Sequence, residues 1–238
     1  MRKPRRSRRI LVAALAVPLL FATACEVVVP VSGTGRAESR PVGSPVLSDS
    51  EAAARVRRSS WEPRPENATA NRTVPTAAEI SWFRALRPEP FMNRVTGNFT
   101  GTTDEIIQWA AHKWGIDEDV VRSVATAESW WRMSAVGDNG ESHGLMQVRF
   151  KYHPGTEPAA RSTAFNVDYW GAVQRYYYEG HGTWLNTAGG NGATYAAGDF
   201  WGSIGTWYSG RWRDAGALGY IDKIAQDTAD KPWEQAGF

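Results

Sequence analysis

The chain has 238 residues, of which 42% are hydrophobic and 22% are charged. This composition is typical of one or two globular domains, and it excludes a wholly disordered chain and a multipass membrane protein. The formal net charge of +2 is misleading, because six basic residues fall within positions 2–9 and the rest of the chain carries 21 basic against 25 acidic residues. The chain therefore lacks the basic excess of a nucleic-acid-binding protein, and we expect no nucleic-acid partner.

The N-terminus has the three regions of a secretory signal. Residues 2–9 are basic, residues 10–24 are almost wholly apolar, and the apolar run ends in small residues. As a helix these 15 apolar residues would rise about 22 Å, which is short of the ~30 Å hydrocarbon core of a membrane. We therefore expect residues 1–24 to be a signal peptide and the protein to be exported to the cell envelope.

Cys25 follows the signal directly and is the only cysteine, so no intrachain disulfide can form. Its position resembles the cleavage site of bacterial lipoproteins, which implies a lipid-modified Cys25 that anchors the protein to a membrane. An ordinary secretory signal that is cut nearby is the alternative, since Ala22 stands where lipoprotein sites more often have Leu. Arg8-Arg9 also resembles a twin-arginine signal, so the export route stays open.

Residues 25–75 are predicted to form a disordered tether. From position 26 this segment has six prolines, repeated small and polar residues, and one tryptophan, Trp61. Such a composition buries too little apolar surface to offset the entropy lost on ordering. We expect the tether to hold a folded domain away from the membrane surface.

Helical patterns begin at residue 76. Thr76 and Glu79 form a capping-box pattern that predicts a short helix ending before Pro88, and residues 76–101 are taken as this helix and a linker. Two further helices are predicted over residues 103–114 and 117–130 from their apolar spacing. Alternating strand patterns are absent from the sequence, so residues 102–238 are predicted to form a mainly α domain.

Glu128 is the first candidate for chemistry. It lies four residues after Val124 and seven after Val121, on the apolar stripe of the predicted helix, and it precedes Trp130-Trp131. Burial disfavours an ionised carboxyl group and raises its pKa, which suits a general acid for glycosidic bonds. An ion pair with Arg122 or Arg132 at the helix end is the alternative.

The segment after this helix carries a more specific pattern. Gly137-Asp138-Asn139-Gly140 forms a predicted turn, and Gly144-Leu145-Met146-Gln147-Val148 and His153 follow it. Together with Glu128-Ser129, this order resembles the goose-type lysozymes and the soluble lytic transglycosylases, from near Thr103 to Ile224. The resemblance implies a mainly α, lysozyme-like fold with little or no sheet, and an enzyme that binds and cleaves peptidoglycan glycan strands.

The resemblance also implies roles for single residues. Glu128 would be the catalytic acid, and Asp138 matches the first of two aspartates that hold the hydrolytic water in goose-type lysozymes. The substrate-binding positions would be Ser129, Met146, Gln147, His153 and Tyr208, of which Tyr208 would orient either Glu128 or the substrate. Later matches, such as Tyr220-Ile221, are individually weak.

Arg149 departs from the lysozyme pattern, because it stands where the second aspartate is expected. Hydrolysis with inversion needs a base for water, and only Asp138 or Glu141 is left to serve. Transglycosylases need one glutamate, since the substrate's own groups close a 1,6-anhydro ring. We therefore expect a transglycosylase; a hydrolytic muramidase and an inactive, lysozyme-like cell-wall binding protein are the alternatives.

Other kinds of site are not indicated. The four histidines lack the close spacing of a zinc helix, and no nucleophile-elbow pattern is present. All 12 tryptophans lie at Trp61 or later, which favours an aromatic, carbohydrate-facing cleft or a Trp-rich core. We expect a monomer without metal or cofactor.

Overall fold

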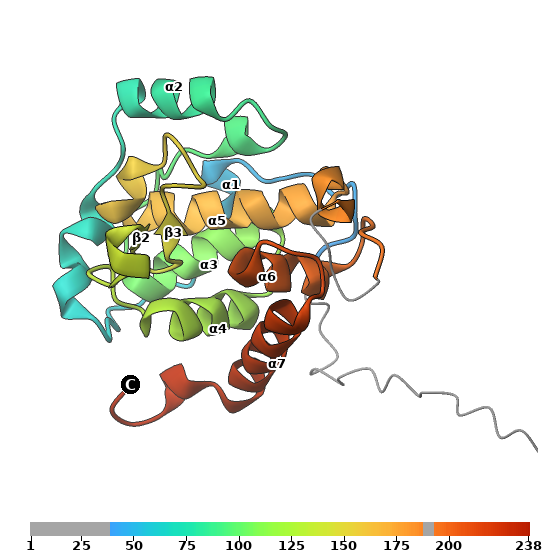
Figure 1. The fold of residues 1–238 in the computed structure, drawn as a ribbon. Coiled ribbons are helices and arrows are strands. Elements are labelled where there is room, and N and C mark those ends of the chain that lie inside the picture. The colour runs from blue at the N-terminus through green and yellow to red at the C-terminus, as the bar shows by residue number, and fades with distance from the viewer. Residues whose placement is uncertain (1–38, 188–192) are drawn as a thin grey trace, which may run out of the picture. The chain divides into compact units, whose positions relative to one another are not determined.

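The computed structural model describes residues 39–187 and 193–238. This part of the chain is mainly helical, as predicted, and carries one small sheet (Figure 1). The helices are α1 (Asp49–Ala53), α2 (Ala77–Leu86), α3 (Thr103–Trp114), α4 (Glu118–Ser129), α5 (Thr163–Tyr178), α6 (Phe200–Ser209) and α7 (Ala215–Asp230). The strands β1 (Val136–Gly137), β2 (Ser142–His143) and β3 (Val148–Arg149) pair antiparallel in that order.

The signal peptide and Cys25 lie outside the described residues. Within the described ranges, no helix combines the length and the apolar character needed to cross a membrane.

The three predicted helices are confirmed, with the expected residues at their ends. Thr76 and Thr102 each form a capping box, with Glu79 at the start of α2 and Glu105 at the start of α3. Gly115 ends α3 in the left-handed conformation, at φ 69°. The two N-caps satisfy free backbone N–H groups, and Gly115 donates its N–H to the carbonyl of Ala111. Because these caps are local, the sequence is sufficient to locate the helix ends.

The core is built around α5, whose residues 163–175 are all buried. Helix α3 packs against α5 and α4, and α7 packs against α4 and α6 (Figure 1). Asp168 of α5 is fully buried, and it accepts hydrogen bonds from Lys113 Nζ at 2.8 Å and Trp114 Nε1 at 2.8 Å. These bonds satisfy a charge that would otherwise be costly to bury.

The prediction of a disordered tether is wrong for residues 39–75. Helix α1 places Ala52 in the core, and Asp49 accepts a 2.7 Å hydrogen bond from Lys113. Further along, Asn67 is buried and donates to Thr103 Oγ1 at 3.0 Å and to the carbonyl of Trp131 at 2.7 Å. Polar side chains thus fix the segment on the domain, and an estimate from apolar area alone misses such contacts.

The predicted boundary at residue 102 is also wrong, because residues 39–101 belong to the same compact unit as the rest of the described chain. Phe83 of α2 is fully buried and makes edge contacts with Phe165 and Tyr169 of α5, at centroid distances of 5.4 and 5.7 Å. Helix α2 is therefore part of the same domain.

Candidate active site

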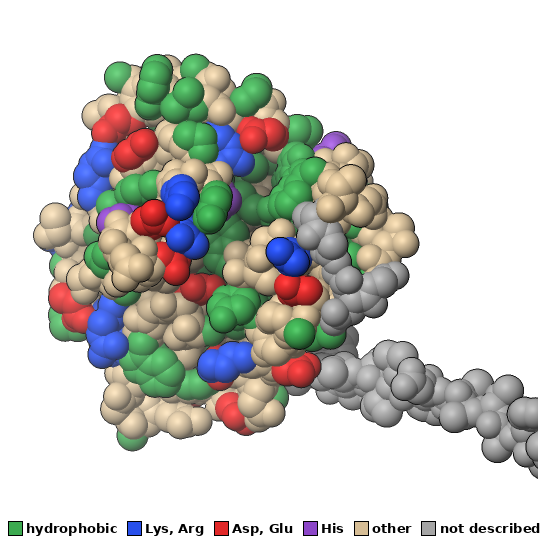
Figure 2. All heavy atoms as spheres, in the orientation of Figure 1, with side chains coloured by type: hydrophobic (Ala, Val, Ile, Leu, Met, Phe, Trp, Pro, Cys, Tyr) green, Lys and Arg blue, Asp and Glu red, His purple; other side chains and the backbone are tan. Residues whose placement is uncertain are grey.

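A cleft of about 1010 Å³ lies between the end of α4, the small sheet, α5 and α6. Figure 2 shows the hollow near the centre of one face, with acidic and basic side chains beside it. Five of the seven predicted catalytic and substrate-binding residues line this cleft: Glu128, Asp138, Gln147, His153 and Tyr208. The fold thus brings together residues that are up to 80 positions apart in the chain.

Glu128 occupies the last turn of α4. Val121 and Val124 on the same stripe are buried, and Glu128 itself is partly buried, so its carboxyl group is directed inward as predicted. The hydroxyl of Tyr220 from α7 donates to Glu128 Oε1 at 2.5 Å. Burial raises the pKa of Glu128 to about 7; the Tyr220 hydrogen bond opposes this rise and the negative charge of Asp138 adds to it.

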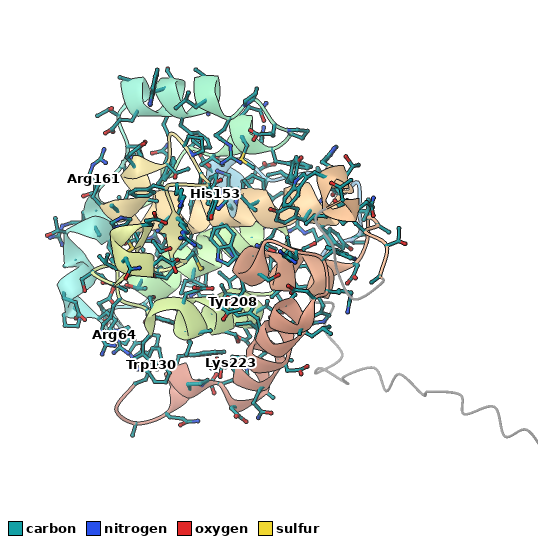
Figure 3. The ribbon with its side chains drawn as sticks, viewed as in Figure 1. Arg64, Trp130, His153, Arg161, Tyr208 and Lys223 are labelled. Carbon is teal, nitrogen blue, oxygen red and sulfur yellow. The ribbon has the colours of Figure 1, made fainter. Side chains whose placement is uncertain are left out.

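Tyr208 stands at the mouth of the cleft, with 63% of its surface exposed. Its ring stacks on Tyr220 at a centroid distance of 5.0 Å and an interplanar angle of 7°. Figure 3 labels Tyr208 and His153, which come from α6 and from the loop after β3. Tyr220 thus makes the contact with Glu128. Tyr208 stacks on the ring of Tyr220, and most of its own surface stays exposed.

Two glycines of the sequence motif, Gly137 and Gly144, are explained by close contacts. A Cβ atom on Gly137 would lie 2.4 Å from Gln147 Oε1, and one on Gly144 would lie 2.4 Å from Asn166 Nδ2. Asn166 of α5 donates to the carbonyls of His143 and Ala159 at 2.9 Å. Gln147 is held in turn, since its amide donates to the carbonyl of Gly144 at 2.9 Å. The motif therefore builds a rigid wall of the cleft.

The carboxylates beside the sheet are partnered. Asp138, half-exposed at the cleft, accepts a hydrogen bond from Ser142 Oγ at 2.5 Å. Arg149 pairs with Glu141 at 2.6 Å and lies 3.8 Å from Asp138. Arg149, which stands where the family has a second aspartate, thus forms ion pairs with the two carboxylates that could otherwise activate water.

Two predicted substrate-binding residues lie outside the cleft lining. Ser129 donates its hydroxyl to the carbonyl of Ala125 at 3.2 Å, so the expected role in a sugar subsite is not met. Met146 is fully buried, and its carbonyl accepts from Trp207 Nε1 at 3.1 Å. Met146 therefore orients Trp207, which does line the cleft.

His153 lines the cleft between two aromatic rings. It stacks on Trp207 at a centroid distance of 5.4 Å and 19°, and its Nδ1 atom lies 2.7 Å from Tyr169 Oη. Burial, followed by the nearby charge of Arg87, lowers the pKa of His153 to about 3. The imidazole is therefore neutral at physiological pH.

Tyr220, Trp207, Tyr169 and Arg87 were not identified as site residues from the sequence. Their contacts join α2, α5, α6 and α7 to the cleft, and such long-range contacts leave no local pattern. Two of the four carried a weak signal: Trp207 is one of the tryptophans expected to offer rings to sugars, and Tyr220-Ile221 is a weak match to the family's later segment.

No cluster of His, Cys, Asp and Glu suited to a metal ion occurs in the part of the chain that the structure describes. Comparison with family models, curated proteins and solved structures found no match to this chain.

Proposed function

We propose that this protein is an exported peptidoglycan lytic transglycosylase with a lysozyme-like fold, which cleaves the β-1,4 bond between N-acetylmuramic acid and N-acetylglucosamine. The observation that carries the proposal is Glu128, a partly buried carboxyl group in a cleft, with a pKa of about 7. An acid that keeps its proton near neutral pH can protonate a glycosidic oxygen. Trp207 and Tyr208 offer ring faces for sugars along the same cleft.

In this mechanism Glu128 donates its proton to the leaving oxygen as the glycosidic bond breaks. The carbonyl oxygen of the substrate's N-acetyl group stabilises the positive charge at the anomeric carbon. The Glu128 carboxylate then takes the proton of the 6-hydroxyl group, whose oxygen bonds to that carbon and closes a 1,6-anhydro ring. Glu128 is protonated again, and no water is consumed.

Arg149 favours this outcome over hydrolysis. An arginine side chain cannot act as a base at physiological pH. Its ion pair with Glu141 and its closeness to Asp138 also make both carboxylates less available to polarise a water molecule. Ring closure needs neither carboxylate.

A hydrolytic muramidase is the second candidate, because Asp138 lines the same cleft as Glu128 and keeps half of its side chain exposed. In that case Asp138 would hold a water molecule on the face of the sugar opposite Glu128. An inactive wall-binding protein is disfavoured, since the acid and the tyrosine that holds it are both present.

Replacement of Glu128 tests the proposal. Glu128→Gln keeps the shape and a hydrogen-bond acceptor for Tyr220 but removes the transferable proton, so clearing of purified sacculi should fall by at least ~10²-fold. Glu157→Gln, an exposed change away from the cleft, is the matched control and should keep full activity. A folded Glu128→Gln protein with most of its activity would refute the assignment.

A further inference from the structure

A chain of hydrogen bonds leads from Glu89, shortly after α2, to Nδ1 of His153. Glu89 accepts two hydrogen bonds from Arg87 Nε, at 3.0 and 3.1 Å. Arg87 Nη1 in turn donates to Tyr169 Oη, which lies 2.7 Å from His153 Nδ1. Glu89, Arg87 and His153 all line the cleft, whereas Tyr169 is fully buried behind it.

The donor and the acceptor of each hydrogen bond follow from the chemistry of the side chains. A guanidinium group can only donate, so the oxygen of Tyr169 accepts from Arg87. Burial raises the pKa of Tyr169 far above its ordinary value, so the phenol keeps its one proton, and that proton is left for His153 Nδ1. Arg87 Nη1 also lies 3.5 Å from Nδ1, so the second neighbour of this nitrogen is a donor too. His153 Nδ1 must therefore accept.

A neutral imidazole that accepts at Nδ1 carries its proton at Nε2. Among the described residues, Nε2 of His153 has no hydrogen-bond partner, and it is not one of the buried polar atoms left without one. Because His153 lines the cleft, this N–H is free to meet a ligand there. Trp207, stacked on the imidazole and fixed by its bond to Met146, holds the ring in this orientation.

We propose that Glu89, Arg87 and Tyr169 are positioning residues that hold His153 as the Nε2–H tautomer, and that this N–H donates to an N-acetyl carbonyl oxygen of the glycan. The second part rests on the proposed function. A fixed donor at this point favours a sugar that presents an acceptor, and it disfavours a de-N-acetylated sugar, whose ammonium group can only donate. The site thus discriminates between an N-acetylated and a de-N-acetylated sugar bound next to Trp207.

The tautomer is tested first, by nitrogen NMR of the ¹⁵N-histidine-labelled protein at pH 7, with His153→Gln used to assign the signals. We expect a single Nε2–H form in the wild type. In Tyr169→Phe, which keeps the ring packed against Phe83, we expect a mixture of tautomers. Tyr178→Phe, a buried change on the same helix outside the cleft lining, should leave the His153 signals in place. A protonated Nδ1 in the wild type would overturn the proposal that Glu89, Arg87 and Tyr169 hold the Nε2–H tautomer.

Recognition of the acetyl group is tested by binding to the Glu128→Gln protein, so that cleavage plays no part. Affinity for N-acetylated glycan strands should fall by about two- to tenfold in Tyr169→Phe, the range of one neutral hydrogen bond. Affinity for chemically de-N-acetylated strands should be weak in both proteins and equal. Equal loss for both ligands would contradict recognition of the acetyl group. No binding of either ligand by either protein would overturn the proposed function as well, while the NMR result would still decide the tautomer.

Discussion

Glu128 has two neighbours that act on its pKa in opposite directions. The hydrogen bond from Tyr220 stabilises the ionised carboxylate and lowers the pKa, whereas the charge of Asp138 disfavours it and raises the pKa. Since a general acid works only while protonated, activity should fall as the pH rises through about 7. The pH at which activity falls, the basic limb of the pH profile, therefore reports the balance between the effects of Tyr220 and Asp138 on the pKa of Glu128.

We expect Tyr220→Phe to move the basic limb of kcat/KM to higher pH and Asp138→Asn to move it to lower pH, each by about one unit or less. Tyr208→Phe should leave the limb in place, because Tyr208 stacks on Tyr220 without bonding to Glu128. The measurement is the pH dependence of kcat/KM on soluble glycan strands. Shifts in the same direction for Tyr220→Phe and Asp138→Asn would contradict the assignment of Glu128 as the titrating acid.

At the scale of elements, the ends of α2, α3 and α4 could be predicted because their caps are local. Helix α5 also has a local cap, Ser162, but residues 163–175 are buried on every side and show no amphipathic period from which to predict its length. The order of residues 39–75 could not be predicted for another reason. They are held by polar contacts such as those of Asn67, which are formed only with distant partners.

The same contacts predict the effect of truncation. A chain that begins at Thr76 loses the burial of Ala52, the Asp49–Lys113 ion pair and the bonds of Asn67 near the end of α4. We expect its midpoint of thermal unfolding to fall by about 10 °C, equivalent to ~3 kcal/mol or more for a domain of this size. A chain that begins at Ser39 is the control and should match the full-length protein. Equal midpoints for the two truncated chains would show that residues 39–75 do not stabilise the domain.

At the scale of the whole molecule, the proposed lipid anchor at Cys25 would fix the protein to a membrane. If Cys25 carries lipid, Cys25→Ala should move the protein from the membrane fraction to the soluble exported fraction, because one acylated residue supplies the anchor. Thr34→Ala, outside the signal, is the control and should remain with the membrane. Retention of the alanine variant in the membrane fraction would refute anchoring through Cys25.

The site as a whole could be predicted in part. Glu128 and the segment from Gly137 to Gln147 could be recognised because they lie close together in the sequence, and close contacts explain two of the segment's glycines, Gly137 and Gly144. On the opposite side of the cleft, Arg87 and Tyr169 could not be predicted, because segments distant in sequence bring them to the site.

The central claim is that Glu128 acts without an activated water molecule. Digestion of purified sacculi in ¹⁸O-labelled water, followed by mass spectrometry of the products, tests it most directly. Ring closure leaves the label out, so we predict mainly unlabelled 1,6-anhydromuramic ends. Predominant labelling of new reducing ends would contradict this account, and it would show that Asp138 positions water despite Arg149.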